Sequence, residues 1–162
     1  MIYKVREKFW ALGADFSITD ANDRECFTVD GKAFSFGDKL SLQDTSGREV
    51  AFIDQKLLSF KPRYKIIING KKFAEVVKEW SWFNKKFTLD VPGPNDYEIE
   101  GSFWQHEFVF TRRGREVAQI SKKLWSWSDA YGVNIVDGED DIAILCTCIV
   151  IDQVLDDEQR NS

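Results

Sequence analysis

Short stretches of alternating or β-branched apolar residues follow one another along most of the 162-residue chain. This period of two is typical of half-buried β-strands, and turn signals rich in Gly, Asn and Asp separate the stretches. Asn69-Gly70 is the clearest hairpin signal, because both residues tolerate the positive φ of a two-residue turn. The pattern predicts twelve strands, at 2–7, 9–19, 25–30, 33–42, 49–57, 63–68, 72–80, 85–91, 97–103, 107–112, 115–124 and 130–136.

A weak internal repeat supports this series of hairpins. Three segments, beginning at Gly47, Gly70 and Gly114, share a turn glycine, two polar residues, an apolar residue and an alanine. An aromatic residue follows seventeen positions after each glycine, and a serine flanked by apolar or aromatic residues lies between. We interpret the repeat as a strand–turn–strand unit with a structural role. The serine segments are Leu58-Ser59-Phe60, Trp80-Ser81-Trp82 and Trp125-Ser126-Trp127, and the aromatic residues are Tyr64, Phe87 and Tyr131.

One segment departs from the strand pattern. The ten residues from Ile142 to Ile151 carry no charge, and acidic residues beginning at Asp137 precede them. Taken alone, the run is compatible with a strand buried on both faces. A helix is favoured because acids stabilise the positive end of a helix dipole, Asp137 can cap the first turn, and Val154 and Leu155 continue a helical stripe. A helix that is apolar on every side must be surrounded by protein.

These elements predict a mainly β protein, a closed twelve-stranded antiparallel barrel around one central hydrophobic C-terminal helix. Closure removes the exposed edges of a sheet. Side chains alone fill a barrel of about eight strands, whereas twelve strands leave a lumen. The apolar helix is the candidate to fill that lumen. We expect a single domain over residues 1–158 and a disordered tail over 159–162.

Charge is distributed unevenly along the chain, whose net charge is −5. From Lys56 to Lys86 there are nine basic residues and two acidic ones. From Asp137 to Glu158 there are eight acidic residues and no basic one. A weakly acidic protein is not typical of general nucleic-acid binding, which needs a basic face and a high isoelectric point. We therefore expect no nucleic-acid partner.

The ends and the cysteines favour an intracellular protein. Met1 to Arg6 has no apolar run after its positive charges, unlike a secretory signal. The ten-residue apolar run is half of the roughly twenty residues that a helix needs to cross a bilayer. Cys26, Cys146 and Cys148 make no disulfide framework. We expect a cytoplasmic protein, either free or peripheral at a membrane.

A set of longer motifs runs in order through residues 2–156. They are Arg6-Glu-Lys-Phe-Trp-Ala-Leu-Gly-Ala-Asp-Phe16, Val29-Asp-Gly-Lys32, Asp38-Lys-Leu-Ser-Leu42, Tyr97-Glu-Ile-Glu-Gly-Ser-Phe-Trp104, Ser121-Lys-Lys123, Asp129-Ala-Tyr-Gly-Val133 and Asp137-Gly-Glu-Asp-Asp141. In these motifs the chain resembles the LURP-one-related family of the tubby C-terminal-like superfamily. The resemblance implies the same barrel around a central helix. That superfamily includes tubby proteins, which bind phosphoinositides through a basic face, and phospholipid scramblases, whose longer hydrophobic C-terminal segment this chain lacks.

Candidate catalytic and metal-binding groups are sparse. The single histidine, His106, lies near Ser102 and Glu107, but neighbours at one strand junction cannot converge as nucleophile, base and orienting group. Cys146 and Cys148 point about 200° apart on a helix, whereas zinc takes four ligands, so we interpret them as small buried apolar residues. We expect no enzyme, cofactor or metal. Helix capping is our interpretation, with a weak cation site as the alternative, for the acids Asp137, Glu139, Asp140 and Asp141.

The basic stretch is the candidate binding surface. Its residues lie on successive hairpins, so alternate members are expected to share an outer face beside Trp80, Trp82 and Phe83. Basic and aromatic residues together suit anionic phospholipid headgroups. The other interpretation is a solvated exterior whose lysines prevent edge-to-edge pairing. The candidate ligand-binding residues are Lys56, Lys61, Arg63, Lys65, Lys71, Lys72, Lys85, Lys86, Lys122 and Lys123, with Lys78 in the same stretch.

Two functions are compatible with these residues. The first is a non-enzymatic tubby-like domain that binds an anionic ligand, a phospholipid headgroup or the membrane surface at its basic face. The alternative is a protein–protein interaction or scaffold module with no lipid role, in which Trp82, Trp104 or Trp127 would anchor a partner.

Overall fold

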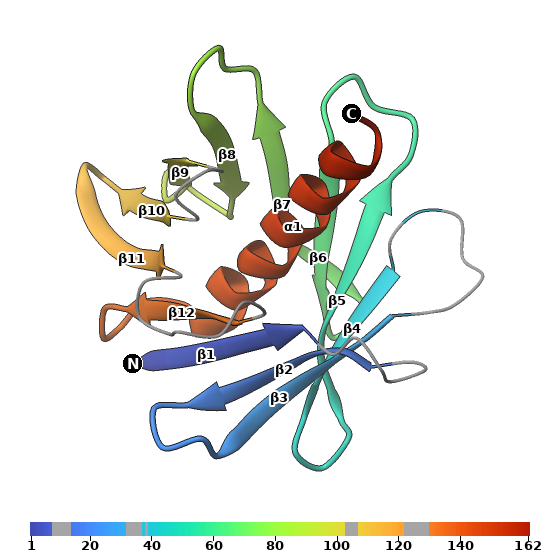
Figure 1. Cartoon of the computed structure of the whole chain (residues 1–162), viewed down its shortest axis with the longest axis vertical. Coiled ribbons are helices and arrows are strands. Elements are labelled where there is room, and N and C mark those ends of the chain that lie inside the picture. The colour runs from blue at the N-terminus through green and yellow to red at the C-terminus, as the bar shows by residue number, and fades with distance from the viewer. Residues whose placement is uncertain (8–13, 32–36, 38, 103–106, 122–129) are drawn as a thin grey trace.

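The computed structural model describes residues 1–7, 14–31, 37, 39–102, 107–121 and 130–162. Twelve strands and one helix make up this part of the chain (Figure 1). They are β1 (Ile2–Glu7), β2 (Ala14–Asp20), β3 (Glu25–Gly31), β4 (Lys39–Asp44), β5 (Glu49–Lys56), β6 (Arg63–Ile68), β7 (Lys71–Glu79), β8 (Lys85–Asp90), β9 (Tyr97–Ser102), β10 (Glu107–Arg112), β11 (Arg115–Ser121), β12 (Ala130–Ile135) and α1 (Asp141–Arg160).

The strands form a closed antiparallel barrel, which confirms the architecture expected from the sequence. Each strand pairs with its neighbours in the sequence, and β1 closes the barrel by pairing with β12 as well as β2. The predicted strands at 9–19 and 33–42 correspond to β2 and β4, whose described parts begin at Ala14 and Lys39. At the β6–β7 hairpin, Asn69 and Gly70 have φ values of 52° and 73°, as a two-residue turn of this type requires.

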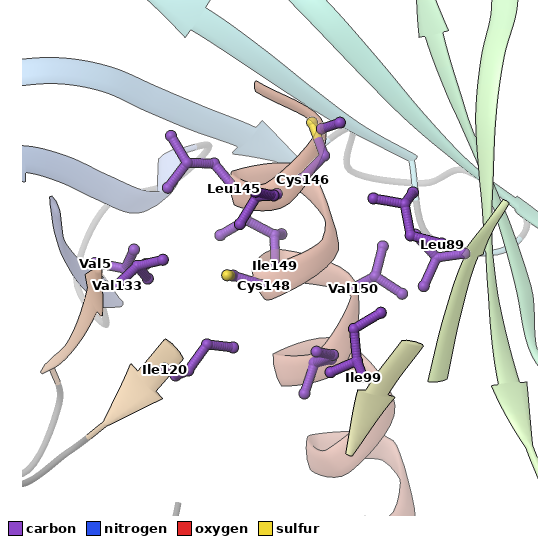
Figure 2. Close-up of a cluster of buried hydrophobic side chains, with 14 of the residues drawn as sticks. Val5, Leu89, Ile99, Ile120, Val133, Leu145, Cys146, Cys148, Ile149 and Val150 are labelled. Carbon is purple, nitrogen blue, oxygen red and sulfur yellow. The ribbon is translucent and has the colours of Figure 1, made fainter. Parts of the chain in front are cut away.

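Helix α1 fills the barrel (Figure 1). Every residue from Ala143 to Ile151 is buried, so the predicted central helix is confirmed. Figure 2 shows its side chains directed outward on all sides, Cys148 toward the wall that carries Ile120 and Val133, and Val150 toward Leu89 and Ile99. The buried Thr147 hydroxyl donates to the carbonyl oxygen of Ala143 at 2.8 Å, so this polar group adds no unpaired donor to the core.

The helix begins and ends at residues slightly different from those expected. Asp140, not Asp137, is the N-cap, because its carboxylate accepts a hydrogen bond from the Ala143 amide at 3.0 Å. The helix continues through Arg160, so Gln159 and Arg160 belong to it and not to a disordered tail. Among the described residues, no helix is both long and apolar enough to cross a membrane.

Antiparallel pairing sorts the connections between strands onto two ends of the barrel. The end that we call the turn end carries the tight, polar connections that follow β2, β4, β6, β8 and β10, together with the start of α1. The opposite end, which we call the loop end, carries the connections that follow β5 and β7, at residues 57–62 and 80–84, and receives the C-terminal part of α1. The connection from β12 to α1 lies at the turn end.

Candidate functional site at the loop end of the barrel

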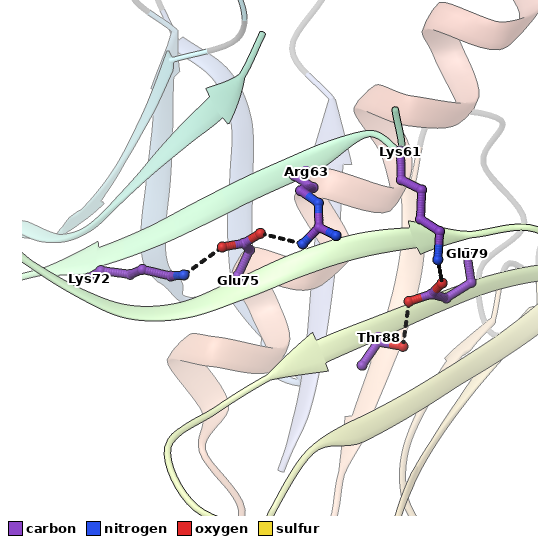
Figure 3. Close-up of polar contacts among 6 residues, drawn as sticks. All are labelled: Lys61, Arg63, Lys72, Glu75, Glu79 and Thr88. Carbon is purple, nitrogen blue, oxygen red and sulfur yellow. Dashed lines mark hydrogen bonds and ion pairs between the residues drawn. The ribbon is translucent and has the colours of Figure 1, made fainter. Parts of the chain in front are cut away.

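The two described connections at the loop end lie side by side. The strands that carry them, β6 and β7, are paired, with Arg63 opposite Val77. The Lys78 amide donates to the Pro62 carbonyl at 3.0 Å, which continues the contact beyond the last strand pair. Lys61 in the first connection forms an ion pair with Glu79 at the end of β7 (Figure 3). The two segments therefore form one continuous surface.

This surface exposes large apolar side chains to an unusual degree. Four of them are at least 94% exposed, and Trp80 and Leu57 are more than half exposed. A folded protein rarely leaves large apolar residues together in water unless they contact a partner or a membrane. We call these six residues the apolar patch: Leu57, Leu58, Phe60, Trp80, Trp82 and Phe83.

Basic residues border the apolar patch, but acidic residues neutralise several of them. Lys86, which lies between Glu79 and Glu100 in the strand register, approaches the Glu100 carboxylate at 3.8 Å. Lys56, by contrast, forms no ion pair with any residue that the structure describes. The border therefore combines paired and unpaired cations. Its described members are Lys56, Lys61, Lys85 and Lys86.

The outer face of the barrel is not a uniform basic stripe. In the register across β4 to β7, Lys39 lies opposite Asp54, Asp54 opposite Lys65, and Lys65 opposite Glu75. Opposite charges alternate along this row, which stabilises the sheet and reduces the potential outside it. Lys65, a predicted ligand-binding residue, therefore lies between two acidic residues, Asp54 and Glu75. The excess of basic residues in this part of the sequence did not indicate that arrangement.

Glu75 has two cationic partners on this face (Figure 3). Arg63 donates to its carboxylate at 2.9 Å and Lys72 at 2.5 Å. Burial alone would raise the pKa of Glu75, but these two hydrogen bonds and charges outweigh burial and lower it. The Glu75 carboxylate therefore stays ionised. Its ion pairs neutralise Arg63 and Lys72, two of the predicted ligand-binding residues.

Lys78 and the border residue Lys85 contact the helix inside the barrel. Lys78 and Lys85 both contact Glu158 near the end of α1, and the Lys85–Glu158 distance is 2.7 Å. Burial, together with the charge of Lys85, lowers the pKa of Lys78. These ion pairs hold the C-terminal part of the helix against β7 and β8. Nothing in the local sequence linked residues 78 and 85 with residue 158, which is why these partners were missed.

The remaining predicted ligand-binding residues do not gather at one place. Lys71 follows the β6–β7 turn at the turn end, with Lys72 beside it. Neither Lys65 nor Lys71 forms an ion pair with the described residues. Lys122 and Lys123 lie outside the described residues. The structure thus brings together the lysines that border the apolar patch. It places Lys71 and Lys72 at the opposite end of the barrel.

The candidate catalytic and metal-binding groups have structural explanations where the structure describes them. His106 lies outside the described residues, and so do Trp104 and Trp127. Burial raises the pKa of the Cys146 thiol to about 12 and raises that of Cys148 as well, so both remain neutral. Within the described ranges, no group of three or more His, Cys, Asp or Glu residues is placed to hold a metal ion.

The acids before the helix take part in a polar network at the turn end. Glu139 accepts two hydrogen bonds from Arg112, at 2.7 and 3.0 Å, and one from the Tyr97 hydroxyl at 2.9 Å. Arg112 is the main cause of the lowered pKa of Glu139. Asp141 accepts a hydrogen bond from the Tyr3 hydroxyl at 2.6 Å. These contacts position the start of α1, in agreement with a structural role for the acids.

A closed twelve-stranded barrel around a C-terminal helix is the architecture of a tubby-like barrel domain. The profile of the LURP-one-related family matches residues 1–152, and the chain belongs to that family. It is 37% identical to the uncharacterised Bacillus subtilis protein YxjI over 158 residues, which cover 98% of this chain and 96% of the relative. An X-ray structure of an Arabidopsis thaliana protein shares the fold, with a TM-score of 0.68, 21% identity and coverage of 98% of this chain and 91% of the other.

Proposed function

We propose that this domain is a non-enzymatic module that binds membrane surfaces rich in anionic phospholipid, with the loop end of the barrel facing the bilayer. The observation that carries the proposal is the apolar patch on two adjacent connections, bordered by lysines. Aromatic rings are favoured at the membrane interface, and lysines beside them meet the phosphate groups. The sequence predicted that an anionic ligand, a headgroup or the membrane surface binds the basic face. In this proposal the apolar patch inserts into the membrane, and the lysines around it contact the surrounding layer of headgroups.

Apolar transfer supplies the first part of the binding free energy. Removing a large exposed apolar side chain from water is worth about 1.5–3 kcal/mol. Leu58, Phe60, Trp82 and Phe83 are almost fully exposed, so even partial immersion of these four gives several kcal/mol. These side chains do not pack in the core, so they contribute little to the stability of the fold. Their exposure to water lowers the solubility of the protein.

Electrostatic attraction supplies the second part. Each basic residue near an anionic membrane contributes about 1 kcal/mol, and this term weakens as salt screens the charges. Lys56 is free to act in this way, whereas Lys61 and Lys86 first share their charge with Glu79 and Glu100. We expect Lys56 to dominate among the described cations. Lys122 and Lys123, which follow the last residue of β11 in the sequence, are further candidates.

Co-sedimentation with phospholipid vesicles tests the proposal. We expect binding to vesicles of phosphatidylcholine and phosphatidylserine at low salt, weaker binding at high salt, and little binding to phosphatidylcholine alone. Replacing Trp82 and Phe83 together by serine should weaken binding at least about tenfold. Lys56→Glu should weaken it by about thirtyfold, since one attraction of about 1 kcal/mol is lost and a repulsion of similar size is added.

Matched controls come from the turn end. Val136 is 53% exposed there, so Val136→Ser removes exposed apolar surface without touching the patch. Lys71→Glu reverses an exposed charge on the same end. Both controls should bind vesicles as the wild type does. If the wild type does not bind anionic vesicles at low salt, the lipid proposal is wrong. The same apolar patch would then favour the protein-interaction alternative, with Trp82 as an anchor.

A further inference from the structure

A cavity of about 190 Å³ lies inside the loop end, between α1 and the wall formed by β1, β10, β11 and β12. Its helical lining falls at spacings of three and four residues from Cys148 to Gln159, so one face of the helix bounds it. Figure 2 shows Cys148 directed toward the wall that carries Ile120. An engineered apolar cavity of about 150 Å³ binds benzene, so this space is large enough for a ring with a short substituent.

The described lining separates into an apolar floor and a polar rim. The floor is formed by four buried side chains, those of Phe108, Ile120, Ile151 and Leu155. The rim carries carboxylates that already have partners. Asp156 forms an ion pair with Arg160 at 2.7 Å, and Glu7 and Asp152 also have interaction partners within the protein. The rim therefore leaves no charge for a ligand to balance, and the apolar floor favours an uncharged ligand.

The Tyr131 hydroxyl is a buried donor without a hydrogen-bond partner. Tyr131 lines the cavity and is only 8% exposed, and its hydroxyl forms no hydrogen bond. Burial raises the pKa of Tyr131 far above its usual range, with contributions from Asp152, Cys148 and Glu7, so the hydroxyl keeps its proton. Because these three residues also line the cavity, the hydroxyl end of the ring lies on the cavity side. Among the described lining residues, no other buried side-chain nitrogen or oxygen is unpaired.

We propose that this cavity binds a small neutral carbonyl compound, with an aromatic ring or short hydrocarbon chain against the apolar floor and the carbonyl oxygen accepting from the Tyr131 hydroxyl. A buried donor without a partner destabilises a protein, and a ligand that accepts from it removes that cost. A carbonyl oxygen accepts the hydrogen bond and brings no donor that would itself need a partner. The proposal is independent of membrane binding, since none of the residues involved belongs to the apolar patch.

Two probes of nearly equal shape test the site and its hydrogen bond. Acetophenone carries a carbonyl oxygen where α-methylstyrene carries a methylene group, so only acetophenone can accept from Tyr131. Titration calorimetry on the full chain measures the affinity for each. The methyl signals of Ile120 and Ile151 in NMR spectra should shift with both probes, which places them in the cavity. The double replacement of Trp82 and Phe83 by serine should leave both affinities unchanged, which excludes binding to the apolar patch.

A pair of tyrosine substitutions separates ligand binding from a purely structural role. Tyr131→Phe removes the unpaired hydroxyl, so the free protein should melt at a higher temperature. The ratio of its affinities for acetophenone and α-methylstyrene should fall at least about fivefold from the wild-type ratio, because the carbonyl then has no donor. Tyr3→Phe removes a hydroxyl that is bonded to Asp141 at the turn end, so this control should melt at a lower temperature and keep the wild-type ratio.

Three results would overturn the inference. If neither probe binds the wild type and shifts the two methyl signals, the cavity holds water only. If Tyr131→Phe keeps the wild-type ratio of affinities, the hydroxyl does not bind the carbonyl group. If Tyr131→Phe melts at a lower temperature than the wild type, the hydroxyl already has a partner in the free protein. None of these results bears on vesicle binding, which depends on residues elsewhere at the loop end.

Discussion

The two ends of the barrel use their residues in opposite ways. At the turn end, short polar connections satisfy their own backbone groups, as Asp44 does by accepting from the amides of Ser46 and Arg48. Glu139 and Asp141 fix the helix start there by hydrogen bonds to side chains of the wall. At the loop end, large apolar side chains lie in water. The turn end therefore maintains the fold, whereas the two described connections at the loop end carry apolar surface that the fold does not use.

The largest expected effect on stability comes from substitutions in the buried part of α1, because both ends of the barrel pack around this helix. Ile144 and Ile149 are completely buried. Replacing either by aspartate would place a charge without a partner inside the barrel, at a cost of several kcal/mol. We expect both variants to lose the cooperative thermal transition in circular dichroism. A variant that melts close to the wild-type temperature would show that the helix is not the support of both ends.

A smaller effect on stability is expected from replacing Glu139 at the turn end, and this effect should depend on pH. Its folded pKa is lowered, chiefly by Arg112, so its stabilisation is present above the unfolded pKa of about 4.3 and is lost as the pH falls through the folded pKa. Glu139→Gln should cost about 2 kcal/mol near neutral pH.

The difference between Glu139→Gln and wild type should begin to shrink as the pH falls below about 4.3, and it should disappear below the lowered folded pKa of Glu139, where the wild-type carboxylate is protonated as well. Urea unfolding of the two proteins between neutral and acidic pH measures this difference. An undiminished gap at acidic pH would mean that the charge of Glu139 is not what stabilises the turn end.

The smallest effect on stability should come from the loop end. Trp82 and Phe83 are 97% and 99% exposed, so replacing both by serine removes no packing. We expect the free energy of unfolding to change by no more than about 0.5 kcal/mol per substitution, although vesicle binding falls sharply. A clear loss of stability would show that these side chains support the fold after all, and would remove the contrast between the two ends.

The fold was accessible from the sequence because its signals are local. The period of two, the Asn69-Gly70 turn and the uncharged run from Ile142 each lie within a short window, and each predicted the correct element. The cap was placed at Asp137 instead of Asp140 because several adjacent acids are equally able to cap, and only the backbone path decides among them.

The candidate site was only partly accessible, because it depends on contacts between distant segments. The sequence indicated a basic stretch beside aromatic residues, and the structure does place Trp80 and Trp82 in an exposed group. It could not indicate that Glu75 lies opposite Lys65, or that Glu158 binds two lysines of the stretch. Strand register and the position of the helix end determine these pairings, and neither follows from local composition.

The seam between β1 and β12 has a consequence for how the molecule is made. β1 is synthesised first, but it completes its pairing only when β12 is present, and α1 follows β12 in the chain. Until then, the sheet exposes its inner apolar residues and two open edges, features that favour aggregation. The barrel therefore cannot close before β12 has been synthesised, and it cannot be filled before α1 follows.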